Sequence, residues 1–160
     1  MFRFLFLLAM FSLAAIAWLV WGLFRRALFK RRTDRASRQF RRHRHALEGQ
    51  LFAAAAASGK PRGLIWEKCD LHDGLVLARD RANGELVGLV GVTIGFKAVA
   101  GGTLENVEAV GNLRAATAVF HWNGRQWSTQ GRAVFNLEPR EVIDRYRSSL
   151  DVVAVEHTTV

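Results

Sequence analysis

The sequence predicts an α+β protein: an N-terminal transmembrane helix, a basic helical stalk, and a curved antiparallel β-meander of about five strands with a C-terminal helix packed on it. Three observations carry this prediction. Residues 4–24 contain no charged side chain, and the segment that follows combines many arginines with a lack of glycine and proline. Further along, alternating apolar and polar residues flank two Asn-Gly pairs, at 83–84 and 123–124, which is typical of β-hairpins.

The first segment predicts a membrane span. Residues 4–24 are twenty-one uncharged residues, and as a helix they would measure about 31 Å, close to the apolar thickness of a bilayer. Trp18 and Trp21 stand near the end of the run, where indole rings favour the headgroup boundary. A cleaved signal peptide is the alternative. Because the run is long for a signal peptide and no small-residue cleavage motif precedes the basic segment, we expect a retained signal anchor over residues 1–24.

Positive charge is concentrated directly after this run. Ten residues between Arg25 and Arg44 are lysine or arginine, against the single acid Asp34. Residues 58–160 carry twelve basic and twelve acidic side chains, so the net charge of +9 belongs to the N-terminal part. Basic residues that flank a span stay on the cytoplasmic side. We therefore expect a single-pass protein of the cell (inner or plasma) membrane, with its N-terminus outside and its C-terminal domain in the cytoplasm.

The basic segment also predicts contact with anionic lipid headgroups, each nearby charge contributing about 1 kcal/mol. The residues expected to make this contact are Arg25, Arg26, Lys30, Arg31, Arg32 and Arg35. An acidic protein partner is an alternative. A nucleic-acid partner is disfavoured, because few aromatic residues are interleaved with these charges.

Three segments are expected after the span: a basic juxtamembrane helix, a linker and a small cytoplasmic α+β domain, at residues 25–57, 58–62 and 63–160. Phe29, Phe40 and Leu51 recur every eleven residues, which keeps them on one stripe of a helix. The stripe either self-associates or docks on a partner, or the helix lies on lipid or on the chain's own domain. The density of like charges opposes self-pairing, so we favour the second interpretation.

The strongest strand signal surrounds Asn123 and Gly124, the preferred pair for a two-residue type I′ turn. Such a turn would place Phe120 opposite Trp127 and leave one face of the hairpin apolar and the other in solvent. The apolar face would carry Ala116, Ala118, Phe120, Trp122, Trp127, Ala133 and Phe135. A second hairpin is expected around Asn83-Gly84, a further strand is expected to begin near Leu104, and internal glycines predict curvature.

After Asn136 the chain predicts a helix that packs on the sheet, with an apolar stripe of Pro139, Val142, Ile143, Tyr146 and Leu150. Residues 151–156 could add an edge strand. A helix followed by a curved sheet resembles the broad layout of cystatin-like and NTF2-like cones. That resemblance concerns architecture alone.

Two groups of residues are candidates for chemistry. Cys69, His72 and Asp73 form the densest reactive cluster, but Asp73-Gly74 is typical of a turn, and zinc sites usually draw on a second ligand pair. We therefore expect no metal, no cofactor and no catalytic residue. Trp66, Phe120, Trp122 and Trp127 could line a concave pocket or form the core, and a domain of this size favours the core.

These observations favour an accessory or scaffold protein that presents a protein-interaction domain near the membrane, with a protein partner or self-association through the stalk or sheet. The alternative is a tethered cone-shaped domain that binds a small ligand or acts as an enzyme. A membrane-tethered nucleic-acid binder is the third hypothesis.

Overall fold

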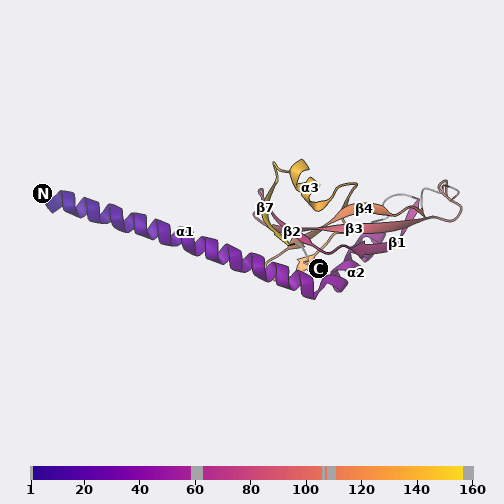
Figure 1. Cartoon of the computed structure of the whole chain (residues 1–160), viewed down its shortest axis with the longest axis horizontal. Helices are drawn as coiled ribbons and strands as arrows, with labels where there is room; N and C mark the ends of the chain where they lie inside the picture. Colours follow the sequence, from indigo (N-terminus) through magenta and orange to yellow (C-terminus); the bar gives the residue numbers. More distant parts are fainter. Residues whose placement is uncertain (1, 59–62, 106, 108–110, 157–160) are drawn as a thin grey trace. The chain divides into compact units, whose positions relative to one another are not determined.

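The computed structural model describes residues 2–58, 63–105, 107 and 111–156, except that the side chains of residues 2–15 lie outside the description. Within these residues the chain forms three helices and a seven-stranded antiparallel sheet, which confirms the predicted α+β class (Figure 1). The chain divides into two compact units, residues 1–35 and 36–160, and each is described by itself. Residues 59–62, most of the expected linker, lie outside the described part.

Helix α1 runs from Phe2 to Arg42 and supplies nearly all of the first unit. It contains no proline and is rich in leucine, alanine and arginine, all strong helix formers. Thr33 lies within it, and its hydroxyl donates to the carbonyl oxygen of Phe29 at 3.0 Å.

The predicted fold also includes an N-terminal transmembrane helix. Among the residues that the structure describes, no helix is long and apolar enough to cross a membrane. Much of the expected span, residues 4–15, falls where side chains lie outside the description.

Two long strands form the centre of the sheet in the second unit. They are β3 (Leu86–Ala98) and β4 (Arg114–Trp122), which pair antiparallel. On the far side of β3 lie β1 (Leu64–Leu71) and then β2 (Leu75–Asp80), both antiparallel to it. Together β1 and β2 line one side of β3, with an interruption at residues 72–74.

The outer side of β4 is built in the same interrupted way. β5 (Trp127–Ser128) and β6 (Ala133–Phe135) both pair with β4, and the intervening residues leave the ladder. The expected tail strand forms β7 (Leu150–Glu156), antiparallel to β2. Seven strands therefore appear where about five were expected. The strand expected to begin near Leu104 starts instead at Arg114, where its pairing with β3 begins.

The hairpin before β5 differs from the expected register. Trp127 pairs with Trp122 instead of Phe120, and the loop holds four residues. The side chain of Asn123 explains the longer loop, since its Oδ1 accepts hydrogen bonds from the backbone nitrogens of Arg125 and Gln126, each at 2.9 Å. The register shift is two residues, so every side chain keeps its predicted face.

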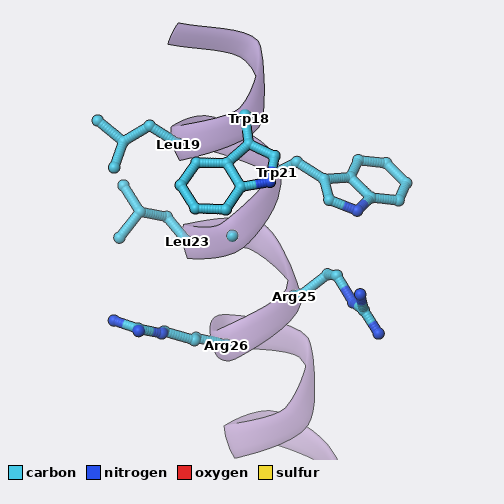
Figure 2. Close-up of a pocket in the computed structure, with 7 residues that line it drawn as sticks. Trp18, Leu19, Trp21, Leu23, Arg25 and Arg26 are labelled. Carbon is cyan, nitrogen blue, oxygen red and sulfur yellow. The ribbon is translucent and has the colours of Figure 1, made fainter. Parts of the chain in front are cut away.

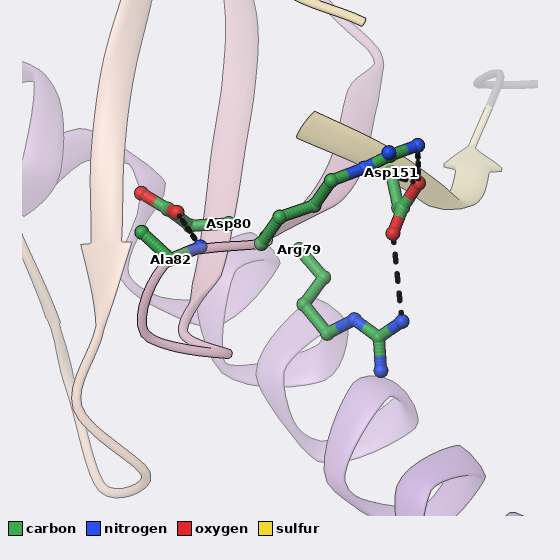
Figure 3. A network of polar contacts seen from close by, with 5 residues as sticks. Arg79, Asp80, Ala82 and Asp151 are labelled. Atoms are coloured by element: carbon green, nitrogen blue, oxygen red, sulfur yellow. Dashed lines mark hydrogen bonds and ion pairs between the residues drawn. The ribbon is translucent and has the colours of Figure 1, made fainter. Parts of the chain in front are cut away.

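Ion pairs fasten β7 to β2 at the loop that follows (Figure 3). The carboxylate of Asp151 pairs with two guanidinium groups: its Oδ1 lies 2.6 Å from Nη2 of Arg81, and its Oδ2 lies 3.5 Å from Nη2 of Arg79. Asp80 turns the loop by accepting from the backbone nitrogen of Ala82 at 2.7 Å. All of these charged groups are well exposed, so each pair contributes at most about 1 kcal/mol.

The aromatic face of the sheet is covered from the N-terminal side of the chain. Phe40, in the last turns of α1, meets the rings of Phe120 and Trp127 edge-on, with centroids 5.1 and 5.4 Å away. Helix α2 (Arg44–Ala57) follows, and it buries Leu47, Leu51 and Ala55. The compact unit thus starts at Ala36, well before residue 63, because these helical residues belong to its core.

The opposite face was expected to be in solvent, and that expectation is wrong. Val76, Val87 and Val119 form a second core cluster with Val142 and Ile143 of α3 (Pro139–Arg145). Helices α2 and α3 therefore lie on opposite sides of the sheet (Figure 1).

Polar groups on this second face are satisfied within the protein. Thr117 is completely buried, and its hydroxyl donates to the carbonyl oxygen of Leu137 at 2.6 Å. Helix α3 begins with a capping box between Glu138 and Glu141 and ends at Arg145, so Leu150 lies in β7 and not on the helix.

Candidate functional site

The predicted site residues lie in three separate places. The six basic residues expected to contact lipid belong to the first unit, whereas the aromatic residues and the reactive cluster belong to the second. All six basic side chains are exposed.

Apolar side chains just before the basic residues are also exposed. Trp18 is 79% accessible and Trp21 is 62% accessible. The other large exposed apolar residues of this stretch are Ile16, Leu19, Val20, Leu23 and Phe24. They point outward at every angle of the helix, so none of its faces is a polar face in this stretch.

The boundary between these two regions contains a surface hollow (Figure 2). It has a volume of about 300 Å³ and is lined by Trp18, Leu19, Trp21, Gly22, Leu23, Arg25 and Arg26. Gly22 has open space beside it, because a Cβ placed on it would meet no atom within 4 Å. In Figure 2 the side chains of Arg25 and Arg26 extend to opposite sides of the helix.

The last arginines of the basic segment have a different environment. Arg41 pairs with Glu156 at 2.9 Å. Arg44 pairs with Asp73 at 3.1 Å and donates to the carbonyl oxygen of Leu71 at 2.7 Å. These two arginines hold helices on the sheet, so they are distinct from the exposed group before residue 36.

The four aromatic candidates are core residues. Trp66, Phe120, Trp122 and Trp127 are each at most 6% accessible. The indole nitrogen of Trp127 donates to the carbonyl oxygen of Ala36 at 2.8 Å, whereas the indole nitrogen of Trp122 is buried with no acceptor among the described atoms. The rings pack against other aromatic side chains: Phe120 and Trp127 meet Phe40, and Trp66 meets Phe96.

The reactive cluster is divided by the pleat of β1. Cys69 is buried on the α2 face, while His72 and Asp73 are exposed in the interruption after the strand. Burial, with smaller contributions from Glu48 and Asp70, raises the pKa of Cys69 to about 11. A thiol that stays protonated is a poor nucleophile and a poor metal ligand.

His72 and Asp73 serve the structure of the strand interruption. The His72 ring lies over Gly91 and its Nε2 is 2.6 Å from the Thr93 hydroxyl. Asp73 is held by Arg44. Across the described residues, no group of three or more His, Cys, Asp or Glu side chains could hold a metal ion.

Two hollows lie on the α3 face of the sheet. One, of about 270 Å³, is bordered by His72, Glu138, Arg140 and Glu156, so its rim carries both signs of charge. The other, of about 150 Å³, has a valine-rich floor beside Tyr146 and His121. Neither brings together an acid and a base in a recognisable catalytic arrangement.

Comparisons with protein-family models, with curated proteins and with solved structures give no match to this chain.

Sequence reasoning missed Gly22 and Arg44. The signal for Gly22 was its helical spacing, with Trp18 four residues before it and Arg26 four residues after it. Nothing in the sequence separates Arg44 from the other nine basic residues of its segment.

Proposed function

We propose that the protein is a single-pass membrane-anchored accessory or scaffold protein, whose small α+β domain presents a protein-binding surface on the cytoplasmic side. The observation that carries the proposal is the ring of exposed apolar side chains around residues 16–24 of α1. Such a surface is costly in water, and a bilayer would cover it. The uncharged run back to Phe4 extends the same character over the length of a span.

The orientation follows from the exposed basic group. Arg25, Arg26 and Lys30 begin directly after the apolar ring, and translocating such a cluster is unfavourable. The N-terminus would then face outward, and the domain would lie on the cytoplasmic side against anionic headgroups.

A binding role is preferred over catalysis for the domain. Its most reactive side chains, Cys69 and His72, face different surroundings, and the thiol is held protonated. The aromatic residues that would have lined a ligand pocket fill the core. The domain still offers surface side chains and strand edges, which proteins commonly use to bind other proteins.

Anchoring is tested by washing membranes of expressing cells with alkaline carbonate. We expect the protein to stay in the membrane, and Ile16→Asp to weaken its insertion because an acid within a span costs about 3 kcal/mol. Leu28→Asp is the matched control, an exposed apolar residue of the same helix beyond the uncharged run. A protein released by carbonate would disprove the anchor, and a tag after Val160 that is reachable from outside intact cells would disprove the orientation.

The accessory role is tested separately, by extraction in mild detergent followed by native mass measurement and identification of co-purifying chains. A stoichiometric complex with another protein supports it. A lone monomer or homo-oligomer would count against it and would favour a ligand-binding domain.

A further inference from the structure

The hollow around Gly22 combines two kinds of surface. Trp18 and Leu19 lie one turn before Gly22, and Arg25 and Arg26 lie one turn after it, so all four neighbour the glycine at the i±3 and i±4 positions. Because Gly22 has no side chain, the space between the apolar residues before it and the arginines after it is open.

We propose that this hollow seats one anionic phospholipid, with its acyl chain against Trp18 and Leu19 and its phosphate on Arg26. The inference rests on the proposed membrane anchor and makes it more specific. It assigns a single stoichiometric lipid to one place on the helix, in addition to diffuse attraction by the whole basic segment.

The chemistry of both halves fits this ligand. Guanidinium groups bind phosphate oxygens through paired, charge-assisted hydrogen bonds. Arg25 and Arg26 extend to opposite sides of the helix, and Leu19 and Leu23 lie on the side of Arg26 (Figure 2), so Arg26 is the arginine beside the apolar part of the hollow. Indole rings favour the depth at which headgroups meet acyl chains, so the Trp18 side chain would lie beside the upper part of the chain.

A second copy of the helix is a poorer occupant of the same hollow. The sequence has no acidic residue before Asp34, so close packing at Gly22 would bring arginines of two chains together without a counter-charge. A phospholipid supplies the counter-charge that a second copy lacks.

The test uses the full chain in phosphatidylcholine vesicles that contain a minor fraction of phosphatidylglycerol, with bromine atoms on the acyl chains of one lipid at a time. Bromine quenches nearby indole fluorescence. Trp66, Trp122 and Trp127 are buried in the second unit, so quenching reports Trp18 and Trp21. We expect brominated phosphatidylglycerol to quench well beyond its share of the membrane, which corresponds to a preference of roughly tenfold for one bound anionic lipid.

Two substitutions test the location. Gly22→Leu fills the hollow while it keeps all charges and adds apolar surface, so insertion persists and the preference for phosphatidylglycerol should be lost. Gly49→Leu is the matched control, because a Cβ at Gly49 also meets no atom within 4 Å but lies in α2. It should leave the preference unchanged.

A second pair of variants tests the role of the guanidinium groups. Arg26→Lys keeps the charge and removes the paired hydrogen-bond geometry, so the preference should fall severalfold. Arg25→Lys is the control, because Arg25 extends to the opposite side of the helix, and it should have little effect.

The outcomes separate the two proposals. If the protein does not enter vesicles of either lipid, the anchor fails and the lipid site fails with it. If it enters vesicles and Gly22→Leu keeps the full preference for phosphatidylglycerol, the site is disproved and the anchor stands.

Discussion

The indole nitrogen of Trp127 donates a 2.8 Å hydrogen bond to the carbonyl oxygen of Ala36, which joins β5 to the last turns of α1. The two residues are ninety-one positions apart in the chain. This bond and the contact of Phe40 with the same indole ring fix residues 36–42 of α1 on the aromatic face of the sheet.

Trp127→Phe should therefore destabilise the second unit by about 1 kcal/mol more than Trp122→Phe. Both indoles are buried and both substitutions remove the same atoms, but only Trp127 loses a hydrogen bond. Chemical denaturation of the two variants measures the difference. Equal losses would mean that the bond to Ala36 contributes nothing to stability.

Gly131 should not tolerate a side chain. It lies so close to α2 that an added Cβ would come within 2.3 Å of the backbone nitrogen of Ala55, and its φ is +73°. Gly84→Ala is the matched control, since Gly84 has a φ of +72° and open space around it. We expect Gly131→Ala to cost roughly 1–3 kcal/mol more than Gly84→Ala in unfolding experiments, because backbone cannot move aside as a side chain can. Similar losses for both would show that α2 is not held closely at this point.

Arg44 should matter more than Arg41, although each arginine pairs with an acid of the domain. Arg44 is mostly buried and also donates to the carbonyl oxygen of Leu71, whereas the side chain of Arg41 is 61% exposed. We expect Arg44→Ala to lower the free energy of unfolding by about 1–2 kcal/mol and Arg41→Ala by less than about 1 kcal/mol. The reverse order would contradict the assigned role of Arg44 in holding α2 against the strand interruption.

The thiol of Cys69 predicts a dependence of stability on pH. Its pKa is raised to about 11 from an ordinary value of 9.0, so folding favours the neutral form. The stabilisation is complete below pH 9 and is lost as the pH rises through 11. The free energy of unfolding of the wild type should therefore fall over this range relative to that of Cys69→Ala, and native protein should react slowly with thiol reagents at pH 8. Rapid labelling of the native protein would show that the thiol is accessible and ionised.

The α+β class and the faces of the strands could be predicted because alternation is local. The two-residue shift in the hairpin left Trp122 and Trp127 on their predicted face, since a strand repeats every two residues. Which helix covers each face of the sheet could not be predicted from this alternation. Val119 and Val134 stand among the polar residues of the second face, and in the sequence these two apolar residues are a sign that this face is also buried. Choosing between α2 and α3 as the cover for the aromatic rings requires tertiary contacts that no local pattern encodes.

The candidate site was predictable to a smaller extent. Exposure of Arg25 and Arg26 follows from their charge, but the division of the basic segment into exposed and domain-bound arginines depends on where Asp73 and Glu156 lie in the fold. The separation of Cys69 from His72 similarly depends on the interruption between β1 and β2.

The second core face has a consequence for how the protein is made. Its cover, α3, and the strand β7 leave the ribosome after the other strands of the sheet. A nascent chain that stops before Leu137 can complete the aromatic face, but it would leave Val76, Val87 and Val119 open to solvent. Truncated products would thus carry an exposed apolar surface of the kind that chaperones and proteases recognise. The domain is therefore protected in the cell only after α3 and β7 have been synthesised.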